Sequence, residues 1–238
     1  MPSETTPQRI LVVVAHPDDV DFGSGGTIAS WTSEGIDVAY CIITNGDAGG
    51  FDPSVPRWEM AEIRQAEQRA AAKVLGVEEI FFLGYPDGRL GVTLELRRDI
   101  SRVIRQVRPD RVLCQCPERN FGRIYASHPD HLAAGEATLC AVYPDARNPF
   151  AHPELLEEGL EAYSVPEVWM MGGPQIDTYV DTTDHLDSKV AALLCHASQI
   201  TDPDALPGWM RQWGEATAQH GGLPEGRTAE SFQRVNTA

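Results

Sequence analysis

One segment near the start of the chain constrains the fold more than any other. Residues 9–16 form a continuous apolar run, rich in β-branched residues, between Arg9 and His16. Such a run is typical of a strand buried on both faces, and strands of this kind occur in parallel sheets that helices cover. We therefore expect helices on both sides of this first strand.

The alternation of strands and helices continues through the first 140 residues. The glycine-rich stretch 22–26 predicts a turn, followed by a helix to about residue 35. Further strands are expected at 36–44, 80–83 and 110–116, and further helices at 57–75, 94–107 and from 127 through 140. This order predicts an α/β fold that is Rossmann-like, with a mostly parallel sheet and helices on both faces.

The pattern is weaker after residue 140. We expect an irregular segment at 143–166, strands at 168–171 and 178–180, a helix at 186–200, a loop at 201–226 and a short helix at 229–235. The length favours a single domain over residues 1–238. Residues 9–140 form its expected core, while residues 141–238 are expected to cover a pocket or form a subunit interface.

Composition excludes several classes of protein. Of 238 residues, 42% are hydrophobic and 23% are charged, as in soluble globular proteins. The formal net charge of -16 makes nucleic acid a poor partner. The first nine residues are polar and no run is long enough to span a membrane, so we expect no membrane partner and a cytoplasmic location. Five scattered cysteines indicate no disulfide framework. The candidate partners are a small molecule and a second copy of the chain in a homo-oligomer.

The first strand ends in a group of residues that packing does not explain. His16, Asp18 and Asp19 follow it directly, and ligands of open α/β sheets bind beyond the carboxyl ends of strands. Two adjacent carboxylates repel each other unless a cation lies nearby. His16 and Asp19 are three residues apart in a turn, so both can reach one metal ion. Asp18 is then free to act as a base.

A second cluster, His128-Pro-Asp-His131, follows the fourth expected strand. Ser127 to Asp130 also fits a helix-capping pattern, so the structural alternative is that Asp130 caps a helix. Capping does not account for two histidines. We take His131 as the third metal ligand and His128 as a second catalytic group.

Two histidines and one carboxylate make a catalytic zinc site whose fourth position is open to water. Zinc lowers the pKa of this water to about 7. Asp18 takes a proton as the water attacks an amide carbonyl, and His128 stabilises the oxyanion and protonates the leaving amine. Asp130 is expected to orient His128 and raise its pKa. The same ligands also suit Fe²⁺, Co²⁺ or Mn²⁺.

Three motifs of the chain resemble those of a known family. Ala15-His-Pro-Asp-Asp19, Thr44-Asn-Gly-Asp47 and His128-Pro-Asp-His131 resemble the motifs of the PIG-L/LmbE-like zinc-dependent deacetylases. The resemblance covers nearly the whole chain. Supporting features are Arg64 with Glu67, Leu83-Gly84 with Asp87-Gly88, and Lys189 with His196-Ala-Ser-Gln199.

This resemblance implies zinc-dependent hydrolysis of an N-acetyl amide on a small glucosamine-like substrate, or of a related cysteine–glucosamine conjugate. It implies His16, Asp19 and His131 as zinc ligands, Asp18 as general base, His128 as the acid partner tuned by Asp130, and Arg64 and Asp87 as substrate contacts. The chain departs from the family at two places: Val20 replaces a frequent glutamate, and Ala126 replaces a tyrosine that helps to hold the oxyanion in some members. Tyr125, one residue earlier, is the candidate to serve instead.

Three other interpretations fit part of the sequence. A dinucleotide-binding loop is disfavoured because Gly23, Gly25 and Gly26 do not match the fingerprint spacing and the nearby aspartates would repel a pyrophosphate. In a non-catalytic metal- or sugar-binding module, Asp18 and His128 would have no function. An amidase that removes a larger acyl group from a glucosamine-type thiol conjugate would use the same chemistry and differ in its pocket loops.

Overall fold

A seven-stranded sheet forms the centre of the computed structural model, which describes residues 6–238. The strand order is β3-β2-β1-β4-β5-β7-β6, and only β7 runs against its neighbours. The strands are β1 (Arg9–Val14), β2 (Asp37–Thr44), β3 (Glu79–Tyr85), β4 (Arg111–Gln115), β5 (Glu167–Met171), β6 (Thr178–Asp181) and β7 (Ala229–Asn236). The predicted α/β fold with a mostly parallel sheet is confirmed.

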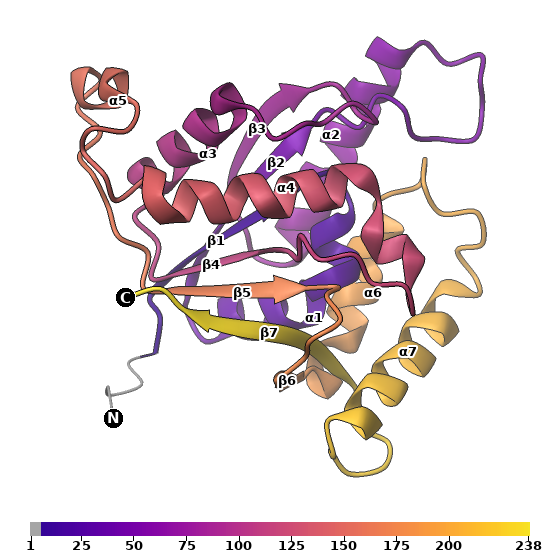
Figure 1. Cartoon of the computed structure of the whole chain (residues 1–238). Helices are drawn as coiled ribbons and strands as arrows, with labels where there is room; N and C mark the ends of the chain where they lie inside the picture. The colour runs from indigo at the N-terminus through magenta and orange to yellow at the C-terminus, as the bar shows by residue number, and fades with distance from the viewer. Residues whose placement is uncertain (1–5) are drawn as a thin grey trace.

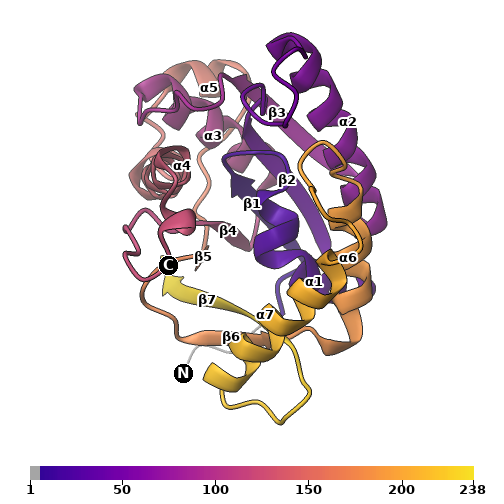
Figure 2. The same cartoon turned by 90° about the vertical axis from the view of Figure 1, so that its right-hand side faces the viewer.

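Helices cover both faces of this sheet (Figure 1, Figure 2). They are α1 (Asp19–Ser33), α2 (Arg57–Val74), α3 (Leu94–Val107), α4 (Pro129–Cys140), α5 (Pro153–Glu157), α6 (Leu186–Leu194) and α7 (Leu206–His220). Apolar residues of α3 and α4 pack on one face, and those of α1, α2 and α6 pack on the other. Among the described residues, none of these helices has both the length and the apolarity that crossing a membrane requires.

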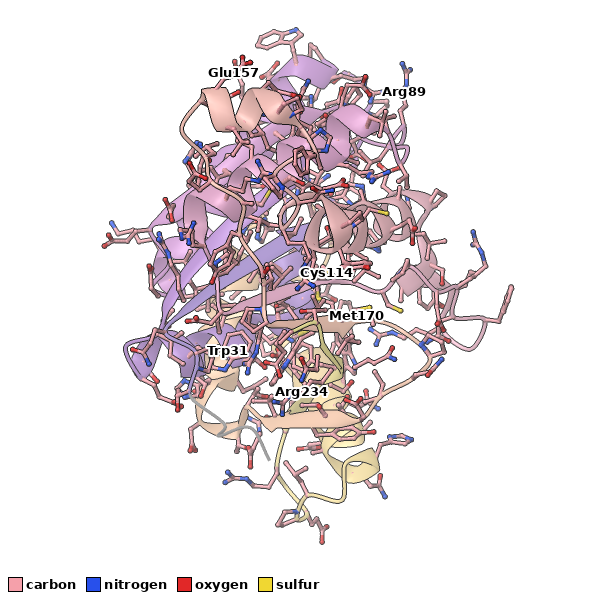
Figure 3. All side chains as sticks on the ribbon, turned by 60° about the vertical axis from the view of Figure 1, so that its left-hand side comes forward. Trp31, Arg89, Cys114, Glu157, Met170 and Arg234 are labelled. Atoms are coloured by element: carbon pink, nitrogen blue, oxygen red, sulfur yellow. The ribbon has the colours of Figure 1, made fainter. Side chains whose placement is uncertain are left out.

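The C-terminal third shares the core of the first 140 residues. Cys114 of β4 lies opposite Met170 of β5, and both side chains belong to the apolar cluster beneath α3 and α4 (Figure 3). On the other face Trp169 packs edge-on against Trp31, with ring centroids 5.7 Å apart. The sheet is therefore one continuous structure from β3 to β6.

Two predictions for the C-terminal third are wrong. Residues 201–226, expected to be a loop, contain the 15-residue helix α7, which has a proline in its first turn and buries Leu206, Met210 and Ala218. Residues 229–235, expected to be a short helix, form strand β7. The partners that pair with β7 are β5 and β6, so tertiary hydrogen bonding decides its conformation.

Three smaller differences concern segment boundaries. The glycine-rich stretch 22–26 lies inside α1 rather than in a turn before it. Its glycines allow close packing, since a Cβ on Gly26 would lie 2.8 Å from Cβ of Thr182. Helix α6 ends at Leu194 instead of residue 200, and the segment 143–166 contains the short helix α5.

The topology brings the two histidine clusters together. The chain runs outward from β1 to β2 and β3, then returns to the opposite side of β1 with β4. Ligands of open α/β sheets bind where the strand order reverses in this way. His16 follows β1, and His131 lies in the first turn of the helix after β4, so both histidine motifs lie at this reversal.

Helix α4 packs so closely on β4 that one glycine is required. A Cβ on Gly135 would collide with the backbone oxygen of Gln115. Alanine is normally better than glycine inside a helix by up to about 1 kcal/mol. We expect Gly135→Ala instead to lower the free energy of unfolding by about 2 kcal/mol, because overpacking of this kind costs about 1–3 kcal/mol.

The matched control is Gly208→Ala in α7, where an added Cβ meets nothing within 4 Å. This control should leave the free energy of unfolding unchanged or raise it slightly. Urea unfolding of both variants and the wild type measures the difference. Equal effects of the two substitutions would contradict the close contact between α4 and β4.

Candidate metal centre and active site

His16 lies at the centre of the candidate site. It follows strand β1 and is 7% exposed. Its ring packs against two other imidazoles, with centroid distances of 5.0 Å to His128 and 5.1 Å to His131. His16 lies 112 positions before His128, and the elements from α1 through β4 come between them in the chain. The fold therefore brings distant residues into one cluster.

Asp19 is held in place by two hydrogen bonds to one oxygen. Its Oδ2 accepts from the backbone N–H of His16 at 2.7 Å and from Nε2 of Gln115 at 2.9 Å. Gln115 ends strand β4, and its Oε1 accepts from the N–H of Ala15 at 3.0 Å. Gln115 thus ties β1 to the Asp19 carboxylate and leaves Oδ1 directed at His131.

The three predicted ligands converge on one point. Nδ1 of His16 lies 3.2 Å from Nε2 of His131 and 3.3 Å from Oδ2 of Asp19, and Nε2 of His131 lies 2.9 Å from Oδ1 of Asp19. Tetrahedral bonds of about 2.0–2.1 Å place neighbouring ligand atoms roughly 3.3 Å apart. These separations therefore fit a metal ion bound by His16, Asp19 and His131.

The other ring nitrogen of His16 faces two more carboxylates. Nε2 lies 3.1 Å from Oδ1 of Asp87 and 3.3 Å from Oδ2 of Asp130. Burial alone would lower the pKa of His16, but Asp19, Asp130 and Asp87 together raise it to about 12. Such a strongly anionic surrounding favours a bound cation, and carboxylates behind a ligating histidine fix its ring orientation.

The structure does not pair Asp130 with His128 as the sequence analysis expected. The Asp130 carboxylate is 1% exposed and accepts from the N–H groups of Gly88 at 2.7 Å and Leu90 at 3.2 Å, besides contacting His16. Burial, together with the nearby His16 and His131, lowers the pKa of His128, although Asp130 acts in the expected direction and raises it. Asp130 therefore serves the His16 side of the cluster, because its side chain points into the fold from the first turn of α4.

His128 is the N-cap of α4 and its ring is exposed. Its Nδ1 accepts the backbone N–H of Asp130 at 3.2 Å. In a neutral imidazole, a nitrogen that accepts leaves the proton on the other nitrogen. Nε2 of His128 therefore carries a proton that it can donate into the site.

Asp18 lies beside the ligands on a strained part of the backbone. Its φ of 89° is in the left-handed region, and its Oδ2 accepts from Nη2 of Arg64 at 3.1 Å. Burial raises the pKa of Asp18 to about 6, although Arg64 opposes this shift. The carboxylate is thus more basic than an exposed aspartate and remains ionised at neutral pH.

The three predicted substrate contacts differ in their surroundings. Arg64 and Asp87 are 4% and 7% exposed, and both line the ligand cluster from the β3 side. Tyr125 is 84% exposed and lies at a cavity of about 850 Å³ that begins beside Asp19 and His131 and extends to α7. The structure places Tyr125 outside the group of three imidazoles.

Two functional candidates were missed in the sequence. Gln115 is a polar residue at the end of an apolar strand, and this position was the available sign of a role. Gln68 lies in the middle of α2, where a glutamine is typical of a solvent-exposed position, yet it is fully buried. Its amide donates to Asp21 of α1, whose carboxylate also contacts His196 in the turn after α6, and no local pattern indicates these contacts.

Comparison with known proteins identifies the family. The model of the PIG-L family, described as GlcNAc-PI de-N-acetylase, matches residues 11–142, which include both histidine clusters. A diacetylchitobiose deacetylase of Thermococcus kodakarensis is 33% identical over 228 residues, 96% of this chain and 83% of its own. This chain belongs to the PIG-L family.

Other relatives of this PIG-L protein are also named as deacetylases. A probable N-acetyl-alpha-D-glucosaminyl L-malate deacetylase 2 of Bacillus anthracis is 30% identical, over 81% of this chain and 82% of its own. The solved structure of N,N'-diacetylchitobiose deacetylase from Pyrococcus horikoshii superimposes with a TM-score of 0.88 at 29% identity, covering 97% of this chain and 85% of that one. The PIG-L protein is thus an amidohydrolase of this family. Its described residues also offer two further groups whose ligand atoms could hold a metal ion, His16 with His128 and His131, and His16 with Asp87 and Asp130.

Metal binding can be tested by removing one ligand. We expect wild type to bind one divalent ion per chain and to lose thermal stability on chelation, because an ion that binds only the folded state stabilises it. His131→Ala should bind no stoichiometric metal, and its melting temperature should not respond to chelator. Elemental analysis and thermal melts give both readouts.

His152→Ala is the control, since His152 lies within 3.5 Å of Asp145, a residue outside this cluster. It should bind metal like wild type. Full metal content in His131→Ala would show that the ligands lie elsewhere.

Proposed function

We propose that this chain removes the acetyl group from the nitrogen of a small N-acetylglucosamine-type substrate, using a divalent metal held by His16, Asp19 and His131. The convergence of these three ligand atoms with Asp18 beside them carries the proposal. The relatives that are named deacetylases of N-acetylated glucosamine compounds support the substrate class. A non-catalytic module with the same ligands would have no use for Asp18 and His128.

Zinc is the proposed ion, because two histidines and one carboxylate with an open position are typical of catalytic zinc. When bound, the ion would supply a Lewis acid for the amide carbonyl and lower the pKa of a water molecule to about 7. Iron, cobalt and manganese suit the same donor atoms. The ligand atoms of this chain thus define where the ion binds, but they suit more than one metal.

Asp18 is the proposed general base. Its carboxylate accepts the proton of the attacking water, and its raised pKa makes this transfer more favourable than for an exposed aspartate. Nη2 of Arg64 donates to Oδ2 of this carboxylate and limits its rotation. The proton then has to reach the amine, which leaves as the carbon–nitrogen bond breaks.

His128 is the proposed partner on the opposite side of the reacting carbonyl. As a neutral imidazole with its proton on Nε2, it can donate a hydrogen bond to the developing oxyanion. The proton that Asp18 has taken from the attacking water passes to the leaving nitrogen as the carbon–nitrogen bond breaks, so that His128 keeps its Nε2 proton throughout. Asp130 acts on this step through its backbone N–H, which holds Nδ1 of His128, and through its contact with His16.

A second candidate function is favoured by the cavity beside the ligands. Its volume of about 850 Å³ lies in the upper part of the range of about 300–1,000 Å³ that takes drug-sized ligands. Asp19 and His131 line this cavity, whereas Arg64, Asp87 and His128 do not. An acyl group larger than acetyl would occupy this cavity while the sugar faces Asp87. The chemistry of this amidase is the same.

The role of Asp18 predicts a clear result. Zinc-loaded Asp18→Asn should keep one metal per chain and lose kcat by about a hundredfold or more, because general base catalysis contributes about 10²–10⁴-fold. Amine release is measured on N-acetylglucosamine, N,N'-diacetylchitobiose and N-acetylglucosaminyl malate. Wild-type release that collapses in the variant supports the amidohydrolase.

The most active substrate in this panel would define the class. Full metal binding without release from any substrate by the wild type would contradict N-deacetylation of these compounds. Unchanged release by Asp18→Asn would contradict the assignment of the base.

The cavity predicts the tolerance for acyl length. Wild type should release glucosamine from its N-butanoyl and N-hexanoyl amides. Thr217→Phe, which fills the α7 end of the cavity, should slow N-hexanoyl hydrolysis by roughly tenfold or more while N-acetyl hydrolysis stays within about twofold, since each excluded methylene is worth about 1–3 kcal/mol.

Ala216→Phe on the exposed side of the same helix is the control and should change neither rate. Rejection of N-hexanoyl glucosamine by the wild type would show that the cavity holds another part of the substrate.

A further inference from the structure

The backbone at Asp18 adopts a conformation that is unusual for a residue with a side chain. Its φ of 89° and ψ of -29° place it in the left-handed region directly before helix α1. This conformation costs free energy for an aspartate and persists only where the surrounding structure enforces it. The direction of the Asp18 carboxylate depends on it, because φ at this residue sets where Cβ points.

Two side chains of α2 hold the peptide unit between Pro17 and Asp18. Nη2 of Arg64 donates to the carbonyl oxygen of Pro17 at 2.6 Å. Oε1 of Gln68 accepts the N–H of Asp18 at 2.8 Å. The carbonyl and the N–H belong to the same planar unit, and residues four apart lie on the same face of a helix. Arg64 and Gln68 therefore clamp this unit at both of its polar ends.

Gln68 is itself held by a buried pair. Its Nε2 donates to Oδ2 of Asp21 at 2.9 Å, and Nε2 of His196 lies 2.9 Å from the same oxygen. Gln68, Asp21 and His196 are all 0% exposed. Because an ionised carboxylate only accepts, Gln68 must direct its amide nitrogen to Asp21 and its oxygen to Asp18. The orientation that the clamp needs is thus imposed by Asp21.

We propose that Gln68, held by Asp21 and His196, is a positioning residue that sets the direction of the Asp18 carboxylate for catalysis. The inference rests on the proposed role of Asp18 as the general base. Gln68 does not touch the ligand atoms and lies behind Asp18, so it acts only through the Pro17–Asp18 peptide. Displacement of a catalytic group by about 1 Å can lower a rate by about a hundredfold.

The test combines Gln68→Met with Asp18→Asn. Methionine has a similar length but neither accepts the Asp18 N–H nor donates to Asp21. We expect Gln68→Met to lower kcat by about 10–100-fold, with KM within about threefold and one metal per chain retained. In the Asp18→Asn background, the same substitution should leave the residual rate unchanged, because the group that it positions is already absent.

Gln65→Met on the same helix is the matched control, since Gln65 is part-exposed and lies three residues before Gln68. It should leave kcat unchanged. Gln68→Asn keeps a buried amide and withdraws it by one carbon, so it should show the same loss of kcat if Gln68→Met does not fold.

Each remaining outcome overturns the inference in a distinguishable way. An unchanged kcat in folded Gln68→Met, or a loss that is equal with Asp18 and with Asn at position 18, would show that Gln68 is merely structural. Loss of metal together with kcat would show that it supports the ligands rather than the base. If Asp18→Asn alone keeps full turnover, the base assignment fails, and the positioning role fails with it.

Discussion

The repulsion among four aspartates is the constraint on which the rest of this structure depends. Asp18, Asp19, Asp87 and Asp130 lie around His16 with side chains no more than 16% exposed. Carboxylates this close and this buried stay ionised only beside positive charge and hydrogen-bond donors. Imidazoles, backbone N–H groups and one arginine supply part of that charge, and a metal ion would supply the remainder. The site is thus built to hold a cation.

The fold serves this cluster by bringing separate strand ends to one place. Reversal of the strand order between β1 and β4 puts His16 beside His131, and Gln115 joins the two strands through Ala15 and Asp19. The same fold occurs in 4-carboxy-2-hydroxymuconate hydratase from Pseudomonas putida, with a TM-score of 0.77 at 23% identity. The sheet therefore provides a location for chemistry, while the side chains at its edge decide which reaction follows.

Residues that are neighbours in the sequence have different partners at the site. Asp130 and His128 are two positions apart, yet the Asp130 side chain turns to His16 while His128 stays exposed. Arg64 was expected to contact substrate, and the structure uses its guanidinium within the protein, on Pro17, Gly46, Asp18 and Asp87. A sequence motif therefore predicts which residues belong to a site, but not which of them contact one another.

The sequence by itself determined the first four strands, helices α2 and α3, and the histidines and aspartates that meet at the site, because apolar periodicity and charge at strand ends are local properties. Only the tertiary structure decided that residues 229–236 form a strand, since the partners of β7 come from β5 and β6. It also decided that Gln68, from a helix 50 residues away, holds the backbone of Asp18. Hydrogen bonds between distant segments leave no periodic trace in the chain, so their geometry emerges only when the sheet and its helices are packed.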